Sequence, residues 1–543
     1  MKKNIFLMML LASVIVLHSC STDDEDSGSG GGTWSGVTQS ETVSSSLDDN
    51  NVLVTWNDSA TVQVSSNLSG VVSAQIKGGN VTLLADDDLA EEVTYTLQGT
   101  STSGSLYMDG SYKATFVLNG LTLVSPDSAA INIRNGKRIN VELADGTTNT
   151  LMDGSGGSQK ACMMVKGHTE FSGGGSLTLT GKTGHAFWGK EYVLLKVSTG
   201  KITVPSAVGD GFNVNQYFQM NGGELDISGV GDDGIQVSYK TDDDDNVIPL
   251  SEDEDNTSEF LVKGGVLSVA TSAADSKGIK TEGNITICED KGTTVIVVSN
   301  TGASSSSGGN RPGGSSSSSS SVASKAIKAE GNISITAGSL SATSSSHEGM
   351  EAKGTIDISG GVVYVQSSDD AINSGSHLTV TGGYVCAYST GNDGLDANGN
   401  CYLKGGTVYA IGSGSPEVAI DANTESGYKL YLTGGTVVAV GGLESGSSLT
   451  QSCYQASSWS KSTWYTLSDT SGNTFTFKTP SSGGSGMVVS TAGTPSLKSG
   501  VTSSGGTTIF NGMGTVNGTV SGGTSVSLSS YSSGGGGQPG GRW

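Results

Sequence analysis

The segment DAINSGSHLTVTGGYVCAYSTGN, residues 370–392, is one unit of a repeat that decides the fold. It opens with an acidic, a small and an apolar residue, and two short runs of alternating apolar and polar residues follow around a glycine pair. Strands this short cannot bury their own apolar side, whereas stacked units bury a continuous core. The segment therefore predicts an all-β protein built as a single-stranded parallel β-helix.

The opening of this unit recurs along the chain at a period of about 22–23 residues. The openings are Asp210-Gly-Phe-Asn, Asp233-Gly-Ile-Gln, Lys277-Gly-Ile-Lys, Lys325-Ala-Ile-Lys, Glu348-Gly-Met-Glu, Asp370-Ala-Ile-Asn and Asp393-Gly-Leu-Asp, with a partial one at Ala419-Ile420-Asp421. Two longer gaps predict flexible insertions at about residues 240–258 and 300–322. Weaker units upstream, such as Ser176-Leu-Thr-Leu-Thr, extend the predicted β-helix over residues 51–442.

Beyond residue 442 the repeat fades, although β-prone runs such as Thr474-Phe-Thr-Phe-Lys continue. An open solenoid end would leave unpaired strand edges exposed. We therefore expect residues 443–543 to form a C-terminal β cap that carries Trp459 and Trp464 and ends in a disordered Ser/Gly tail.

The N-terminus has the pattern of an export signal. Lys2 and Lys3 precede an apolar run that is short for a membrane span, and the run ends at Leu17-His18-Ser19-Cys20. This ending resembles a lipobox, although His18 is atypical there. It predicts a lipoprotein signal peptide over residues 1–19 and acylation of Cys20. The alternative is an ordinary secretory signal with a chance cysteine.

An acidic and Gly/Ser-rich stretch follows Cys20, and residues 20–50 are expected to form a tether. The acidic cluster directly after the cysteine resembles the surface-export signal of some outer-membrane lipoproteins. We therefore expect a protein held in the outer membrane by its lipid anchor and exposed at the cell surface.

The composition is strongly acidic, with 83 Gly, 8 Pro and a formal net charge of −23 in 543 residues. This charge argues against nucleic acid as a partner, and we expect a monomer. Of the six cysteines, the five other than Cys20 show no short spacing, so neither a disulfide framework nor a zinc site is expected. Cys386 and Cys401 stand in adjacent units and could pair.

Stacking the units turns the opening motif into two polar columns with an apolar column between them. The polar columns are expected on the outer surface or at a corner, and the apolar column inside. The first polar column is Asp210, Asp233, Lys277, Lys325, Glu348, Asp370 and Asp393, and the second is Asn213, Gln236, Lys280, Lys328, Glu351, Asn373, Asp396 and Asp421. The apolar column is Phe212, Ile235, Ile279, Ile327, Met350, Ile372, Leu395 and Ile420.

Carboxylates stacked one coil apart repel each other by about 3 kcal/mol at about 5 Å and an effective dielectric near 20. In the middle units Lys325 stands next to Glu348 and Lys328 next to Glu351, whereas no lysine intervenes further on. Ca²⁺, which takes six to eight oxygen ligands, is the ion expected to offset the repulsion between these carboxylates. The expected ligands are Asp369, Asp370, Asp393, Asp396 and Asp421, and a second candidate set is Asp210, Asp232 and Asp233. The alternative is a row of solvated corner residues, because Asp and Asn favour turns.

Three segments carry a resemblance to a known family. They are Leu118-Asn-Gly-Leu with Leu143-Ala-Asp-Gly-Thr-Thr-Asn-Thr-Leu, Lys277-Gly-Ile-Lys-Thr-Glu-Gly-Asn-Ile-Thr-Ile, and Ser368-Asp-Asp-Ala-Ile-Asn with Asn392-Asp-Gly-Leu-Asp. Over roughly residues 80–442 the chain resembles the bacterial calcium-containing carbohydrate-binding β-helix proteins, which are similar to polysaccharide lyases. The resemblance implies a right-handed β-helix that holds calcium and binds plant-type polysaccharide such as cellulose or polygalacturonate.

The related lyases place an acid, then an acidic pair one coil later, then another acid three residues on. Asp369 or Asp370, Asn392-Asp393 and Asp396 match this arrangement, except that Asn392 replaces one acid. This departure puts lyase activity in doubt.

Three functions remain open from the sequence. A carbohydrate-binding protein without catalytic residues would use exposed aromatic rings, for which the candidates are Tyr364, Tyr384, Tyr388, Tyr402 and Tyr409. A polysaccharide lyase would need a neutral lysine as base, and the candidates are Lys280, Lys328 and Lys404. Lys280 and Lys328 also serve as partners of stacked acids. A structural or adhesin-like surface protein is the third possibility.

Overall fold

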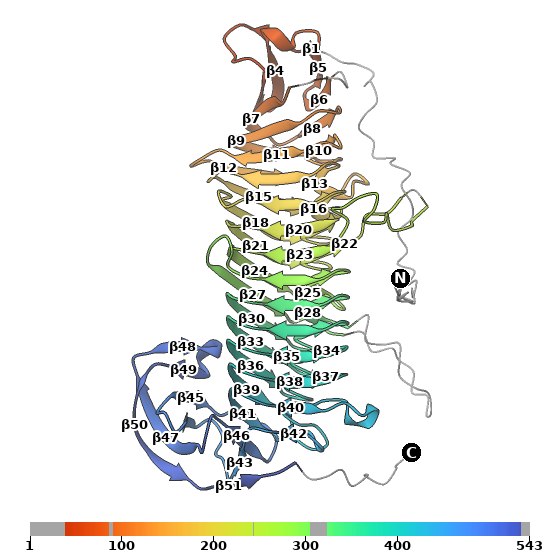
Figure 1. Ribbon diagram of the computed structural model, residues 1–543. Helices are drawn as coiled ribbons and strands as arrows, with labels where there is room; N and C mark the ends of the chain where they lie inside the picture. The colour runs from red at the N-terminus through yellow and green to blue at the C-terminus, as the bar shows by residue number, and fades with distance from the viewer. Residues whose placement is uncertain (1–38, 86–88, 90, 243, 305–322, 534–543) are drawn as a thin grey trace, which may run out of the picture.

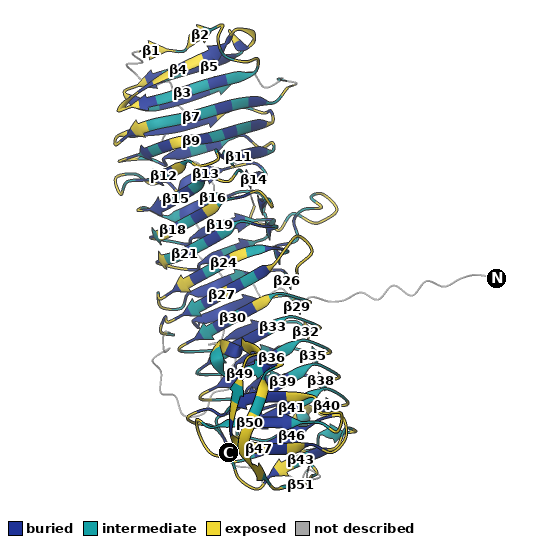
Figure 2. Cartoon of the chain, turned by 90° about the vertical axis from the view of Figure 1, so that its left-hand side faces the viewer, coloured by how far each residue is buried: buried dark blue, intermediate teal, exposed yellow. Residues whose placement is uncertain are grey.

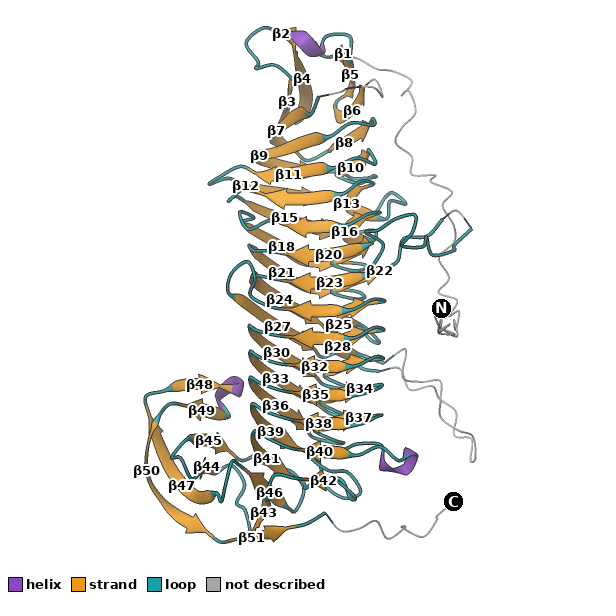
Figure 3. Ribbon diagram, in the orientation of Figure 1, coloured by secondary structure: helices purple, strands orange, loops and turns teal. Residues whose placement is uncertain are grey.

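The computed structural model describes residues 39–85, 89, 91–242, 244–304 and 323–533. In this part of the chain nearly all regular structure is β, and the strands stack into one long solenoid (Figure 1, Figure 3). The helices described are three short 3-10 turns, η1 (Ser66–Leu68), η2 (Thr424–Ser426) and η3 (Phe510–Gly512). Within the described ranges no helix is both long enough and apolar enough to cross a membrane. The predicted all-β parallel β-helix is confirmed; the predicted signal peptide, Cys20 and the start of the tether lie outside the described residues.

Each regular coil contributes three strands, such as β34 (Ile372–Ser374), β35 (Leu378–Val380) and β36 (Tyr384–Ser389). The apolar residue of the opening motif starts a strand, and the acid two residues before it lies at the corner that precedes the strand. These opening strands form a 14-stranded sheet, here called the opening sheet, which is parallel from β6 onward. Its other strands are β1 (Gln39–Ser40), β5 (Val72–Lys77), β6 (Gly79–Ala85), β8 (Gly104–Asp109), β10 (Ile131–Arg134), β13 (Ala161–Val165), β16 (His185–Gly189), β19 (Phe212–Asn215), β22 (Ile235–Ser238), β25 (Lys277–Thr281), β28 (Lys325–Ala329), β31 (Met350–Ala352) and β37 (Leu395–Ala397).

The remaining strands of the coils form two further parallel stacks. The second stack is β11 (Ile139–Leu143), β14 (Thr169–Ser172), β17 (Val193–Leu195), β20 (Tyr217–Met220), β23 (Glu259–Val262), β26 (Ile285–Ile287), β29 (Ile333–Ile335), β32 (Ile356–Ile358), β35, β38 (Cys401–Leu403), β40 (Leu430–Leu432) and β42 (Ser448–Leu449). The third stack is β12 (Thr148–Met152), β15 (Ser176–Gly181), β18 (Lys201–Ala207), β21 (Glu224–Val230), β24 (Gly265–Thr271), β27 (Thr294–Asn300), β30 (Ser339–Ser344), β33 (Val362–Ser367), β36, β39 (Thr407–Ile411) and β41 (Thr436–Val440).

The two stacks merge toward the N-terminus. The long strand β9 (Ala114–Val124) pairs with both β11 and β12, and β7 (Val93–Ser101) and β3 (Asn51–Asn57) continue it. Hairpins close this end, because β4 (Ser59–Ser65) runs antiparallel to β3, and β5 antiparallel to β6. The short strand β2 (Thr42–Ser44) lies on β4. The open edge of the solenoid is thereby covered.

The apolar column lies in strand register from coil to coil and points into the core. Phe212 pairs with Ile235, and the register continues to Ile372 and Leu395. The members of the column are at most 1% exposed, and Figure 2 shows the alternation of buried and exposed residues along the strands. The predicted inward column is confirmed.

The glycine pair allows neighbouring coils to approach closely. Gly383 has a φ of 75°, and a Cβ on it would lie 2.7 Å from the carbonyl oxygen of Gly360. Gly406, one coil later, has the same φ and the same conflict with Gly382. A side chain at either position would push the coils apart, which explains why the pair recurs.

The C-terminal residues form a β cap that also folds back along the solenoid (Figure 1). β46 (Met487–Ser490) runs antiparallel to β41 and β43 (Cys453–Ala456), and β51 (Leu528–Tyr531) completes this part. A separate six-stranded antiparallel sheet follows the order β48 (Thr507–Ile509), β49 (Gly514–Val516), β45 (Thr474–Lys478), β44 (Trp464–Ser468), β47 (Ser496–Ser504) and β50 (Thr519–Val526). Its apolar side packs on the outer side of the third stack, in one cluster with Tyr409 and Ile411.

The first insertion is tied to the coils. Lys240 pairs with Glu191 at 2.7 Å and with Asp253 at 3.2 Å, and Asn256 donates to the carbonyl oxygens of Lys240 and Ile248. Of the second insertion, residues 305–322 lie outside the described residues. Cys386 and Cys401 are both buried and free. They do not pair because Cys401 faces the inner core whereas Cys386 faces the cap.

Candidate functional site

The acidic residues that open four coils each hold the backbone of the coil that follows. One carboxylate oxygen accepts the N–H of the residue at the equivalent position, over 2.6–3.0 Å. The pairs are Asp210 with Asp233, Asp233 with Lys277, Asp370 with Asp393, and Asp393 with Val418. These four acids are 1–7% exposed. Of the two expected places, the corner is the one found for these acids, whereas the outer surface is wrong, because the side chain turns inward to reach the N–H.

In the middle coils lysines neutralise the stacked acids. Lys325 is fully buried, lies 3.1 Å from Glu348 and also pairs with Glu351. The predicted contact of Lys325 with Glu348 is confirmed. Lys328 lies opposite Glu351 in strand register, but its ammonium pairs with Glu330 at 2.5 Å. The reason is that Lys325 and Lys353 already pair with the two carboxylate oxygens of Glu351.

Toward the C-terminus the acids stack without such partners. Burial, together with neighbouring carboxylates, raises the pKa of Asp393 to about 7, of Asp396 to about 8 and of Asp421 to about 9. Other carboxylates, Glu444 among them, are the principal charged neighbours of Asp393 and Asp421 in the described part of the chain. An ionised column is costly here, because the carboxylates are buried and their nearest charged neighbours are carboxylates as well.

Two groups of side chains lie close enough together to share one metal ion among the described residues. Their ligand atoms lie within 4.8 Å of one another, and the groups are His347 with Glu348 and Asp369, and Asp210 with Asp232 and Asp233. The group around Asp210 is the second candidate set of calcium ligands that the sequence predicts. From the first predicted set, only Asp369 belongs to such a group.

The other predicted ligands, Asp370, Asp393, Asp396 and Asp421, are not gathered at one point. The amide of Asn373 lies between two of them and donates to Oδ2 of Asp370 at 3.0 Å and of Asp396 at 2.9 Å. Asp421 shares a hydrogen bond with Glu444 instead. The carboxylates form a column of pairs, and holding one ion would require them to turn toward it.

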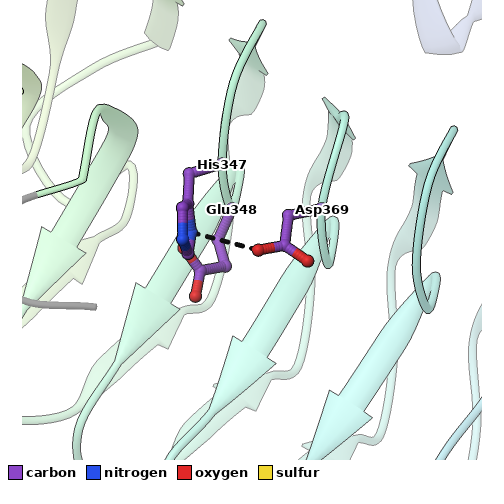
Figure 4. Close-up of side chains that lie close together, drawn as sticks. All are labelled: His347, Glu348 and Asp369. Carbon is purple, nitrogen blue, oxygen red and sulfur yellow. Dashed lines mark hydrogen bonds and ion pairs between the residues drawn. The ribbon is translucent and has the colours of Figure 1, made fainter. Parts of the chain in front are cut away.

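The group around His347 is an ion-paired corner (Figure 4). His347 Nδ1 contacts Glu348 and lies 3.2 Å from Asp369 Oδ2, while Lys325 pairs with Glu348 from the preceding coil. The hydrogen bond to Glu348 raises the pKa of His347. Burial opposes ionisation of Glu348, but His347 and Lys325 outweigh it and lower the pKa of that carboxyl to about 2. An imidazole and a nearby ammonium do not fit Ca²⁺, which prefers oxygen ligands.

The group around Asp210 has a donor set that suits Ca²⁺ better. All three residues offer carboxylate oxygens, and burial raises the pKa of Asp233 to about 6. Lys280 lies 3.3 Å from Asp233 and offsets part of the charge. His185 Nδ1 accepts the backbone N–H of Asp210 at 2.9 Å, so that nitrogen carries no proton for a salt bridge to the carboxylate.

Three of the five tyrosines predicted to contact sugar are closed off by the cap. Tyr364, Tyr388 and Tyr409 are 5%, 8% and 0% exposed, and Tyr384 packs against the same cluster. For the three buried rings the expectation is wrong, because the cap covers the outer face of the third stack. Tyr402 differs, since it lies half-buried on the second stack and stacks on Tyr431 at 5.2 Å.

A column of rings that the sequence reasoning missed lies on the second stack. His168 stacks on Tyr192 at 4.2 Å and Tyr192 on Tyr217 at 4.5 Å, one coil apart each time. His168 also pairs with Glu191 at 3.0 Å. The signal available in the sequence was the coil-length spacing of Tyr192 and Tyr217, just ahead of an apolar strand position.

The lysines considered as catalytic bases are engaged elsewhere. Lys280 is held by Asp233, and although burial opposes protonation, the nearby carboxylates raise the pKa of Lys280. A lysine that stays protonated is a poor base at neutral pH. Lys328 pairs with Glu330, and Lys404 lies over the ring of Tyr402 at 4.8 Å.

Comparison with known proteins gives three findings. Residues 77–371 match the model of the family described as carbohydrate-binding domain-containing protein. A curated protein of Acetivibrio thermocellus with the same description is 27% identical over 164 residues, which are 26% of this chain and 57% of that protein. The chain thus spans little more than half the length of this relative. A solved structure, the polysaccharide lyase-like protein from C. thermocellum as a gadolinium derivative, shares 21% identity, covers 46% of this chain and 92% of its own, and has a TM-score of 0.37.

Proposed function

Because more than half of its length matches one family model, the chain belongs to the carbohydrate-binding domain-containing proteins, and we propose that it is a surface lipoprotein whose β-helix binds polysaccharide. The family match carries the proposal. It covers the coils from the end of β5 to the residue before β34, so the proposal assigns glycan binding to the solenoid. The glycan proposed is of a plant type, such as cellulose or polygalacturonate, as the resemblance noted from the sequence implies.

The second stack offers the best contact surface inside the matched coils. The rings of His168, Tyr192 and Tyr217 are half-buried. The flat ring faces that stack on one another are closed to sugar. The outer edges of the rings can still form hydrogen bonds with sugar hydroxyls. Lys196 pairs with Glu170 at 2.6 Å in the adjoining coils. Carboxylate and ammonium groups of this kind hydrogen-bond sugars in mixed polar sites.

Calcium is part of the proposal as the counter-ion of the acidic column. Asp369, Asp370, Asp393, Asp396 and Asp421 would hold it with oxygen ligands. The closer carboxylates of the Asp210 group supply the second candidate site. A bound Ca²⁺ would offset the charge of the buried column and would let a uronate approach a chain of net charge −23.

Anchoring through acylated Cys20 and exposure on the outer membrane complete the proposal. Their support is the sequence of residues 1–50 alone. The acylated end would hold the solenoid to the membrane, and the tether would let it reach glycan outside the cell.

One experiment separates this proposal from its alternatives. The chain from Ser21 onward is incubated with polygalacturonate or with cellulose in Ca²⁺, and both co-sedimentation and ultraviolet absorbance of an unsaturated product are followed. Co-sedimentation without new absorbance supports a binding protein. Rising absorbance would support a lyase, and the absence of both signals would count against the proposal and favour a structural or adhesin-like protein.

A further inference from the structure

The C-terminal cap carries a cleft of its own, outside the residues that the family model matches. It has a volume of about 570 Å³ and lies among strands β44, β47, β48 and β49. Side chains of Trp464, Val501, Thr502, Ser503, Thr508 and Thr515 line it together with three glycines. Its volume falls within the range of roughly 300–1,000 Å³ found for small-ligand sites.

The cleft is uncharged in a strongly acidic protein. None of its lining residues is acidic or basic, whereas the chain as a whole has a formal net charge of −23. An anionic ligand would meet no cation in the lining and would be repelled by the surrounding field. A cation would find no carboxylate there. The ligand that fits is neutral.

The chemistry of the wall is that of a polyol site. Trp464 presents a partly exposed indole, which can cover the apolar side of a sugar ring. The threonine hydroxyls can both donate and accept hydrogen bonds, as sugar hydroxyls require. The Ser503 hydroxyl packs against Gly518 and is buried, so the hydroxyls of Thr502, Thr508 and Thr515 are the polar groups of the lining side chains that a ligand can reach.

The floor of the cleft is open because of glycine. Gly505 and Gly506 have φ values of 64° and 78°, which a turn between β47 and β48 requires. A Cβ on Gly506 would lie 2.5 Å from the carbonyl oxygen of Val516. The turn therefore packs tightly on β49 and leaves its outer side free of side chains.

We propose that this cleft is a second carbohydrate site, which takes a short stretch of a neutral glycan beside the ring of Trp464. It does not depend on the function proposed for the β-helix, since the matched residues end at 371. Such a site in the cap would add a second point of attachment and raise avidity for a polymer that also contacts the coils.

Calorimetric titration of the full-length chain tests this, in a detergent without a sugar headgroup. The probes are cellohexaose, laminarihexaose, maltohexaose, xylohexaose and mannohexaose, with polygalacturonate as the charged comparison. Binding of at least one neutral hexasaccharide is expected. Trp464→Ala should weaken it tenfold or more, and Trp464→Phe should retain most of it.

Thr508→Val should also weaken binding, while Thr507→Val should not, because Thr507 neighbours it in β48 without lining the cleft. A melting curve for each variant shows that the cap stays folded. The proposal is overturned if no neutral hexasaccharide binds, if Trp464→Ala binds as well as the unmodified chain, or if the two threonine variants behave alike. Failure of polygalacturonate binding alone would bear on the β-helix proposal and not on this one.

Discussion

The backbone N–H of Asp393 donates a hydrogen bond of 3.0 Å to Oδ1 of Asp370, its equivalent in the preceding coil. The acid that opens a coil therefore has a structural task at the corner, independent of any ion. The same bond also brings carboxylates inward and above one another, where water screens them poorly. The stability of the C-terminal coils is thereby tied to how their acids are neutralised.

Removal of Ca²⁺ is expected to lower the melting temperature. A chelator would leave Asp393, Asp396 and Asp421 without a counter-ion, and Asp393→Ala or Asp396→Ala should mimic its effect. Asp393→Asn keeps an oxygen to accept the N–H of Val418 and removes only the charge. It should abolish the response to Ca²⁺ with a smaller loss of stability than Asp393→Ala.

Thermal melts with and without chelator check this prediction. Asp357→Asn, at an exposed position of β32, is the matched control and should respond to Ca²⁺ like the unmodified chain. An unchanged melting temperature after chelation would contradict the proposal that the acidic column binds Ca²⁺.

Without Ca²⁺, stability is expected to fall as the pH rises from about 4 to about 9. Burial and neighbouring carboxylates raise the pKa of Asp393 to about 7, of Asp396 to about 8 and of Asp421 to about 9, whereas aspartates in the unfolded chain titrate near 3.9. Between these values the folded chain binds more protons, so its unfolding free energy decreases with pH. Melts in chelator at about pH 5 and pH 9 measure the trend, and a melting temperature that rises over this interval would contradict it.

Lys325→Met is expected to destabilise the protein by up to about 3 kcal/mol, because Glu348 and Glu351 lose the buried ammonium between them and keep only His347 and Lys353 as partners. Adding Glu351→Gln should restore part of the loss. Lys201→Met breaks an exposed pair with Glu224 and should change little. Denaturant unfolding monitors all three variants. A loss no larger for Lys325→Met than for Lys201→Met would show that the buried carboxylates do not need Lys325.

Tyr409 is expected to matter for docking of the cap and not for glycan. Its hydroxyl donates to the carbonyl oxygen of Lys478 in the cap at 2.9 Å. Tyr409→Ala should cost about 3–5 kcal/mol and should open the cap to protease, while polysaccharide binding by the coils persists. Tyr409→Phe should cost about 1 kcal/mol. Loss of polysaccharide binding in a folded Tyr409→Phe variant would show that Tyr409 contacts glycan after all.

The ring column of the second stack is expected to carry glycan contacts. Replacing Tyr192 and Tyr217 together by Ala should weaken polysaccharide binding at least tenfold. The matched control is Tyr428→Ala, an exposed ring beyond the matched residues. Affinity gels with embedded polysaccharide compare the two. Equal affinity of the double variant and the unmodified chain would place the site elsewhere on the coils.

The register of the coils could be predicted because the repeat sets it. The apolar position that Ile372 occupies recurs once per unit. Because this position must face the core in every coil, the units can stack in only one register. The orientation of Asp370 could not be predicted in this way. A polar corner residue can turn outward to water or inward to the next N–H, and the pattern is the same in both cases.

The burial of Tyr409 depended on contacts that lie far apart in the sequence. The outward positions Tyr409 and Ile411 are apolar like the inward ones, so the sequence shows a face to be covered, but only the return of the cap shows what covers it. The unneutralised acids, by contrast, could be found from the sequence, because the opening motifs of the units after Glu351 contain no lysine, which already shows where the two polar columns lack a counter-charge.

The most direct test of the account is a titration of polygalacturonate and of soluble cellulose oligomers into the chain, in Ca²⁺ and again in chelator. We predict saturable binding to at least one of them in Ca²⁺, weakened at least tenfold in chelator and independent of Trp464 for the charged polymer. Absence of binding to every polysaccharide in the presence of Ca²⁺ would contradict the claim that this β-helix is a carbohydrate-binding surface.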